Sequence, residues 1–203
     1  MANIVVIDYG MGNLASVYNA LKLLGASARV SESASEVSKA DKIVLPGVGA
    51  FRDAIFGLKK RALVEPIKKF LASGKAYLGI CLGLQLLFEE SEEADAKGLG
   101  IFKGKVKRFK EKDGIKIPHI GWNNVQLKAY SLKLTANIED NSYFYFDHSY
   151  YAAPEDKSIV AGTTDYGVSF TSMINKENIY GVQFHPERSQ ALGLKMLENF
   201  IKL

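Results

Sequence analysis

Cysteine is nearly absent from this sequence, with one residue, Cys81, among 203. A single thiol cannot form a disulfide within the chain, which excludes a disulfide-stapled fold and indicates a reducing compartment. Long apolar runs are also missing, and the residues after Met1 have neither the charged start nor the apolar length of a signal peptide or membrane span. We therefore predict a cytoplasmic protein that does not enter a membrane.

An excess of charge of one sign is lacking too. Lys and Arg number 26 against 22 Asp and Glu, a net charge of +4, and the basic residues are scattered. This distribution argues against a nucleic-acid partner. With 203 residues and 47% apolar content, the chain can bury a full core, and we expect one domain over residues 1–203.

Short branched apolar runs alternate with helically spaced segments through the first 90 residues. Such runs indicate strands buried on both faces, and their order predicts a parallel sheet with helices on both sides. The helix that begins at Leu14 is expected to stop near Gly25. Expected strands cover residues 4–7, 26–30, 42–45 and 76–80, and expected helices cover 14–24, 35–40, one or two segments within 51–73, and 82–90.

The second half of the chain is rich in strand-like segments and ends in an amphipathic helix over 190–203. A tight turn is expected at Asp113–Gly114. The fold class is therefore α/β, an open sheet with a parallel N-terminal half and antiparallel strands in the C-terminal half. Expected strands in this half cover 99–109, 115–118, 123–127, 142–146, 159–163, 168–174 and 179–184.

Cys81 stands between Gly79 and Gly83, after a predicted strand and before a helical run. A strand, a sharp turn with a nucleophilic side chain and a helix form a nucleophile elbow, here G-x-C-x-G. Glycines suit the strained turn, and the helix N-terminus favours a thiolate. A lone cysteine is otherwise a small buried apolar residue, but this context favours a nucleophile.

A cysteine nucleophile needs a base and a group that orients the base. His185 follows the last predicted strand, where active sites gather in open α/β sheets, and Glu187 could hold the ring nitrogen that faces away from the sulfur. The alternative is a surface His-Pro turn with a glutamate at a helix start. His119 and His148 are interpreted as recognition or interface residues.

Acyl transfer also requires donors for an oxyanion. The backbone N–H of Leu82, directly after the nucleophile, is one candidate. The glycine-bearing turn 46–49 follows the third predicted strand and can supply the second. A plain strand-to-helix turn is the alternative interpretation of that segment.

A competing motif lies near the N-terminus. Gly10-x-Gly12-x-x-Ala15 follows a strand and opens a helix, and Glu32 lies about twenty residues further on, which matches a dinucleotide-binding fingerprint. That hypothesis leaves Cys81 and His185 unexplained, so we favour a turn that packs near the site.

Several stretches together resemble the class I (triad) glutamine amidotransferases, and among them the glutaminase subunits of imidazole glycerol phosphate synthases. The likeness spans nearly the whole chain in order, and the Pro-His-x-Gly-Trp-Asn stretch is its most specific part. The matching stretches are 8–14, 46–51, 81–88, 118–123, 148–150 and 185–189.

The resemblance implies a flavodoxin-like sheet and hydrolysis of glutamine to glutamate and ammonia, with no metal or cofactor. Cys81 would be the nucleophile, His185 the general base and acid, and Glu187 its orienting partner. The amides of Val48 and Leu82 would form the oxyanion hole. The implied substrate-binding residues are Gly47, Gly49, Gln85, His148, Ser149 and Tyr150.

The resemblance also implies a heterodimer with a (β/α)8-barrel cyclase that uses the ammonia to make imidazole glycerol phosphate in histidine biosynthesis. A close paralogue that feeds a surface-sugar amidotransferase is the alternative. Arg188 stands where the resemblance leads us to expect lysine, and Asp147 where it leads us to expect an apolar residue. The implied interface residues are His119, Trp122, Asn123 and Arg188.

Overall fold

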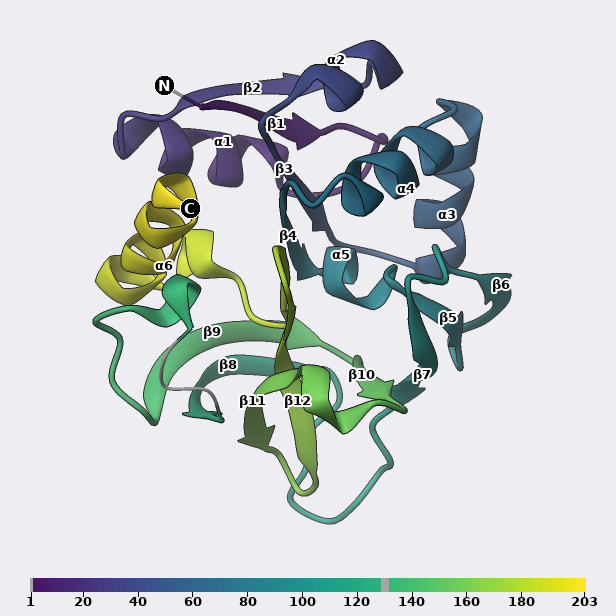
Figure 1. Ribbon diagram of the computed structural model, residues 1–203. Helices are drawn as coiled ribbons and strands as arrows, with labels where there is room; N and C mark the ends of the chain where they lie inside the picture. The colour runs from purple at the N-terminus through teal and green to yellow at the C-terminus, as the bar shows by residue number, and fades with distance from the viewer. Residues whose placement is uncertain (1, 129–131) are drawn as a thin grey trace.

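Parallel strands form the centre of the molecule in the computed structural model, which describes residues 2–128 and 132–203 (Figure 1). The central strands are apolar and buried on both faces, as a parallel sheet requires, whereas the edge strand over residues 27–31 is largely exposed. The register places Gly47 opposite Cys81, so two predicted site segments end side by side. In spatial order these strands are β2 (Ser27–Ser31), β1 (Asn3–Ile7), β3 (Lys42–Gly47), β4 (Ala76–Cys81) and β13 (Ile179–Val182).

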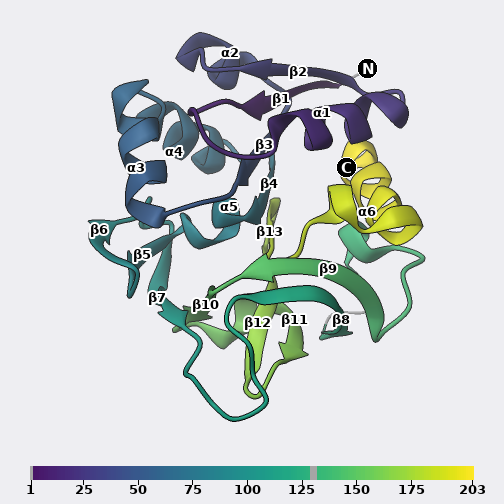
Figure 2. The ribbon, with the colours of Figure 1, turned by 180° about the vertical axis from the view of Figure 1, so that it is seen from behind.

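Helices cover both faces of this parallel row (Figures 1 and 2). Alternate strand residues point to opposite faces, so each strand feeds two cores. Ile4 and Val6 pack with α1 (Leu14–Leu23) and α6 (Gln190–Lys202). Their neighbours on the strand face the other core, with α2 (Ala34–Lys39), α3 (Phe51–Lys60) and α4 (Val64–Ala72).

The sheet continues beyond β13 as mainly antiparallel strands, with two of them, over residues 88–91 and 102–108, paired in parallel, and it branches. One branch ends in a hairpin, and the other curves under α6 as a broad ribbon (Figure 2). The continuing strands are β12 (Ser169–Lys176), β10 (Tyr150–Pro154), β7 (Phe102–Arg108), β5 (Phe88–Ser91) and β6 (Ala94–Lys97), and the branch is β11 (Val160–Asp165), β8 (His119–Leu127) and β9 (Ser142–His148). Short 3-10 turns cover Lys133–Thr135, Lys157–Ile159 and Pro186–Arg188.

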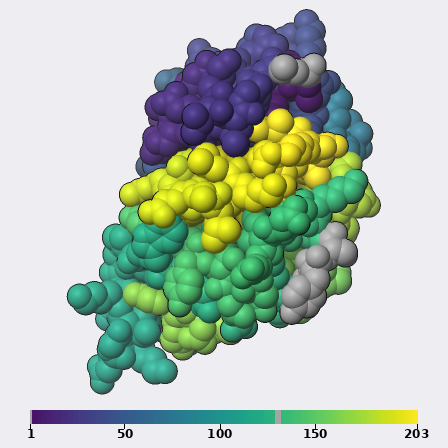
Figure 3. Space-filling model, turned by 90° about the vertical axis from the view of Figure 1, so that its left-hand side faces the viewer, coloured from purple at the N-terminus to yellow at the C-terminus, as the bar shows by residue number. Residues whose placement is uncertain are grey.

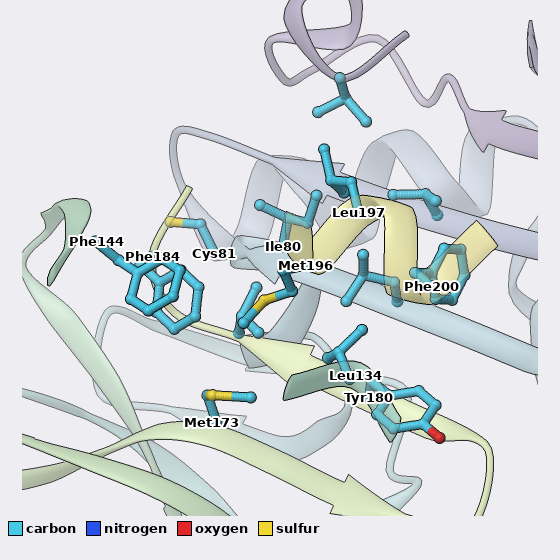
Figure 4. Close-up of a cluster of buried hydrophobic side chains, with 14 of the residues drawn as sticks. Ile80, Cys81, Leu134, Phe144, Met173, Tyr180, Phe184, Met196, Leu197 and Phe200 are labelled. Atoms are coloured by element: carbon cyan, nitrogen blue, oxygen red, sulfur yellow. The ribbon is translucent and has the colours of Figure 1, made fainter. Parts of the chain in front are cut away.

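Helix α6 joins the two halves, lying between the N-terminal segment and the antiparallel ribbon (Figure 3). Met196, Leu197 and Phe200 point from it into one core (Figure 4). Phe144 of β9 stacks on Phe184 in the same core, with ring centroids 4.2 Å apart. This packing fixes the chain on either side of His185. No helix in the described ranges has the length and apolarity needed to span a bilayer.

The predicted mixed α/β sheet is confirmed, but two predicted elements are wrong. The helix after the elbow, α5 (Leu82–Gln85), is much shorter than the expected 82–90, and the chain enters strand β5 at Phe88. The run 82–88 is buried on all sides, so its apolar pattern could not separate helix from strand. The expected strand 115–118 forms only an isolated bridge between Lys112 and Ile115, around the predicted Asp113–Gly114 turn.

Candidate active site

Cys81 is the last residue of β4 and has the strained backbone of an elbow, with φ at +53°. Both flanking glycines are required by packing. A Cβ on Gly83 would run into the carbonyl oxygen of Leu45, and one on Gly79 would lie 2.6 Å from the carbonyl oxygen of Gly83. The elbow therefore presents the sulfur at the end of β4, at the start of α5, as the sequence predicted.

His185 and Glu187 lie together directly after β13. The ring nitrogen Nδ1 of His185 is 2.8 Å from Oε1 of Glu187, and both side chains are buried. Strand β9 anchors this segment, because the backbone N–H of His185 donates to the carbonyl of Tyr145 and the Tyr145 N–H donates to the Ser189 hydroxyl. The other ring nitrogen, Nε2, is buried and has no hydrogen-bond partner among the described residues, so it can serve the sulfur.

The surroundings of His185 favour a charged ring. Burial lowers its pKa, but the neighbouring Cys81 sulfur and the Glu187 carboxylate outweigh burial and raise the pKa to about 10. A cationic ring held by a carboxylate beside a sulfur is the arrangement that activates a cysteine nucleophile. The structure thus brings together the three residues that the sequence predicted as catalytic.

A cavity of about 540 Å³ opens over Cys81. Val48 and Gly49, after β3, line one side, and Leu82 lines the floor beside the sulfur. Gly49 has φ at +96°, which a side chain would disfavour, and a Cβ on Gly47 would collide with the Tyr9 hydroxyl. Both predicted oxyanion segments therefore lie at the sulfur. The other lining residues include Gln85, Pro118, Asp147, His148, Ser149 and Tyr150.

His119, interpreted from the sequence as a recognition or interface residue, has a buried side chain in this structure. It is only 3% exposed and its Nδ1 lies 3.0 Å from Nε2 of His148. Tyr166 stacks on its ring with centroids 3.9 Å apart. The sequence missed this because β8 alternates, and His119 occupies an inward position while its neighbour Ile120 points outward.

Trp122 and Arg188 are exposed, as expected of interface residues, whereas Asn123 is half-buried. The two departures from the resemblance lie against each other: Nη1 of Arg188 is 3.6 Å from Oδ2 of Asp147. The guanidinium of Arg188 also lies over the Tyr145 ring, 4.1 Å from its centroid. Asp147 points outward while His148 points inward, which the strand period predicted.

The glycine turn near the N-terminus packs as part of the scaffold. Glu32, which a dinucleotide site would use for a ribose, is held by Arg61 at 3.0 Å. A Cβ on Gly10 would lie 2.9 Å from the same guanidinium, and Gly12 packs on the end of β3. These contacts favour the packing interpretation over nucleotide binding.

Gln183 was missed by the sequence interpretation. Its side chain is fully buried, and its Nε2 lies 3.5 Å from the Cys81 sulfur. The available signal was its position, because Gln183 directly follows β13 and lies two residues before His185. Among the described residues, no group of three or more His, Cys, Asp or Glu side chains is arranged to hold a metal ion.

Comparisons with known proteins agree with this site. The model of the family "Glutamine amidotransferase class-I" matches residues 5–203. The "Imidazole glycerol phosphate synthase subunit HisH" of Gloeothece citriformis is 49% identical over 202 residues, covering 99% of this chain and 96% of that protein. The protein of the same name from Desulfitobacterium hafniense is 50% identical over 198 residues, covering 97% and 92%.

Solved structures support the fold. "Structure of PurLQS from Thermotoga maritima" matches with a TM-score of 0.77 at 20% identity, covering 100% of this chain and 99% of that one. The glutaminase domain of Trypanosoma brucei CTPS matches with a TM-score of 0.69 at 16% identity, covering 100% and 94%. The family match over nearly the whole sequence, with relatives near 50% identity, leads to one conclusion: the chain belongs to the class-I glutamine amidotransferases.

Proposed function

We propose that this chain is the glutaminase subunit of an imidazole glycerol phosphate synthase and that residues 1–203 act as one amidotransferase domain in the cytoplasm. The observation that carries the proposal is the Cys81 elbow facing the buried His185–Glu187 pair. Relatives 48–50% identical over nearly their full length bear the name of that subunit. The substrate is L-glutamine, and the products are glutamate and ammonia.

The reaction follows from the geometry of the site. The Cys81 thiolate attacks the side-chain amide carbon of glutamine, and the N–H groups of Leu82 and Val48 stabilise the oxyanion. His185, held by Glu187, donates a proton to the departing nitrogen, which leaves as ammonia. The same ring then removes a proton from a water molecule that attacks the glutamyl thioester, which releases glutamate and restores the thiolate.

Cavity residues opposite the oxyanion segment would hold the amino-acid end of the substrate. Gln85 uses its side-chain nitrogen for bonds within the protein, so its carbonyl oxygen is the atom left for the substrate ammonium. Ser149 and Tyr150 line the same side, together with His148. Gly49 lines the cavity beside Cys81, and Gly47 pairs with Cys81 in the sheet, so the backbone of both glycines lies next to the substrate.

Replacing the nucleophile tests the proposal most directly. Cys81→Ala should lower glutamate formation by at least about 10⁴-fold, because no other residue can form the thioester. The assay measures glutamate in the presence of the cyclase subunit, and circular dichroism checks that the fold is kept. Glutamine turnover that survives the substitution would contradict the assignment.

The surface that carries exposed Trp122 and Arg188, with half-buried Asn123 beside Trp122, would face the cyclase, which receives the ammonia. Trp122→Ala should weaken binding of a histidine-pathway cyclase, measured by calorimetry, because a half-exposed indole is a large apolar contact. Phe56→Ala on α3 is the matched control, since Phe56 is also exposed but lies on a different element. Equal effects of the two substitutions would contradict this placement.

A second candidate is a glutaminase that serves a surface-sugar amidotransferase. The observation that supports this candidate is the Asp147–Arg188 ion pair beside the cavity. Both residues depart from the pattern expected of the histidine-pathway subunit. Mixing the chain with the histidine-pathway cyclase and its ligand discriminates the two. Stimulated glutamine hydrolysis supports the first function, and the absence of stimulation favours the second.

A further inference from the structure

The side chain of Gln183 lies between the nucleophile and the core, on a segment that the reaction described above does not use. It is fully buried. Its Nε2 lies 3.5 Å from the Cys81 sulfur, and its Oε1 lies 3.1 Å from Nε2 of Gln85. Gln183 does not line the cavity over Cys81, so it approaches the sulfur from the protein side.

The orientation of the Gln183 amide follows from one fixed acceptor. The carbonyl of Tyr150 can only accept, and the Gln85 side chain reaches it at 2.9 Å, so the Gln85 nitrogen must point there. The same nitrogen then donates to the oxygen of Gln183. The nitrogen of Gln183 is left facing Cys81 as a hydrogen-bond donor.

A buried chain of hydrogen bonds holds that acceptor in place. Nδ1 of His148 donates to the Tyr150 carbonyl at 2.8 Å, so its Nε2 accepts from Nδ1 of His119 at 3.0 Å. Nε2 of His119 in turn accepts from the Asn123 amide at 3.3 Å. Each donor in the chain has an acceptor, so the direction of the Gln183 amide is set from several elements.

We propose that Gln183 is a positioning residue that holds the Cys81 sulfur by donating to it, and that it favours the thiolate over the thiol. The catalytic use of this contact rests on the proposed glutaminase function. The stabilisation of the Cys81 thiolate itself is present in the resting protein, without substrate. A thiolate accepts a hydrogen bond more strongly than a thiol does, so the donor stabilises the charged form.

Other polar groups also face Cys81, and they are unchanged by substitution at Gln183. The backbone carbonyl of Asp147 is 3.9 Å from the sulfur, and the hydroxyl of Tyr9 is buried close to it. A change in the titration of Cys81 can therefore be assigned to Gln183 by comparison with the wild-type protein. Among the described residues, the titratable groups around the sulfur or its cavity are Tyr9, Glu93, Asp147, His148, Tyr150, His185 and Glu187.

The test uses the single cysteine of the chain, which makes alkylation by iodoacetamide a readout of one site. The rate is measured from pH 4 to pH 10 without glutamine or cyclase, for wild type, Gln183→Glu and Gln183→Met. Gln183→Glu should move the midpoint upward by at least about one pH unit, since a carboxylate replaces the donor. Gln183→Met should slow alkylation below the midpoint by about tenfold.

Gln126→Glu is the matched control, because Gln126 is exposed on β8, and its profile should equal that of wild type. Should Gln183→Glu fail to fold, Gln183→Met decides, and in wild type the Gln183 side-chain amide resonance should shift as Cys81 titrates. The proposal is overturned if a folded Gln183 variant has the same alkylation rate as wild type at every pH. It is also overturned if the Gln183 side-chain amide resonance does not shift while Cys81 titrates. Alkylation does not require glutamine hydrolysis, so a negative alkylation result can be distinguished from a negative result in the glutaminase assay.

Discussion

Two regions of buried histidine lie close together in this molecule and have opposite electrostatics. At the end of β13, the Cys81 sulfur and the Glu187 carboxylate overcome burial and raise the pKa of His185 to about 10. At the end of β9, burial, assisted by nearby His119 and His185, lowers the pKa of His148 to about 3 despite its bond to the Tyr150 carbonyl. Burial also lowers the pKa of His119 to about 4.

The difference shows that burial alone does not decide the charge of a histidine. The same ring is kept neutral where its neighbours are carbonyl, amide and imidazole groups, and is charged where a sulfur and a carboxylate face it. The neutral pair is suited to fix hydrogen-bond direction in a scaffold. The charged ring is suited to move protons at the nucleophile.

The largest effect is expected from removing the Glu187 carboxylate, which helps to make the pKa of His185 differ from those of His119 and His148. Glu187→Gln should lower kcat/KM for glutamine by about 10²- to 10⁴-fold, because the ring loses both its orientation and its counter-charge. The pKa of His185 should fall toward the values of the neutral pair, which NMR titration measures. Glu198→Gln, at a surface ion pair on α6, is the control and should leave both quantities unchanged.

The neutral pair should make the fold sensitive to acid. Unfolded histidine titrates near 6.5, so between pH 6.5 and about 4 the unfolded chain binds protons that His119 and His148 in the folded protein do not. The stability contributed by these two neutral rings is therefore complete above pH 6.5 and falls as pH drops through this window, by up to about 1.4 kcal/mol per pH unit for His148. His185 adds no slope there, because it is charged in both states below pH 6.5.

Urea unfolding between pH 4 and pH 8 measures this slope. His148→Asn keeps a donor for the Tyr150 carbonyl and removes the titrating ring, so its stability should fall less steeply with acid than that of wild type. An identical slope in the variant would show that His148 is not held neutral.

The smallest effect is expected at the exposed ion pair. Asp147 and Arg188 are both more than 40% exposed, so water screens their attraction, unlike that of His185 and Glu187. A double-mutant cycle with Asp147→Asn and Arg188→Gln should give a coupling of about 0.2–1 kcal/mol in the free energy of unfolding. A coupling of several kcal/mol would show that the Asp147–Arg188 pair is not weakened by water and would contradict its distinction from the buried His185–Glu187 pair.

Much of the parallel half could be predicted because its signals are local. Branched apolar runs such as 42–45 and 76–80 became buried strands, and the Gly79–Cys81–Gly83 pattern became a strained elbow. His185 and Glu187 were predicted as a pair from their spacing, their place after a predicted strand and the need of the Cys81 elbow for a base. These features depend on backbone sterics and on neighbours within a few residues.

The predictions from the sequence failed where a segment is completely buried or where its paired strand lies far away along the chain. The helix after Cys81 stopped at Gln85 because Phe88 pairs with Phe102 in β7, fourteen positions away by residue number. The inward position of His119 follows from its pairing with His148 on β9. The residues next to Phe88 and His119 in the sequence do not indicate that their partners are Phe102 and His148.

By itself, the sequence determined the alternation of strands and helices in the parallel half, the glycine elbow that carries Cys81, and the place of His185 and Glu187 after a strand, since these follow from local conformation and spacing. Only the tertiary structure decided which histidines are neutral and which is charged, which amide faces the sulfur, and that Asp147 meets Arg188. The physical reason is that charge state and hydrogen-bond direction depend on groups that folding brings together from distant parts of the chain.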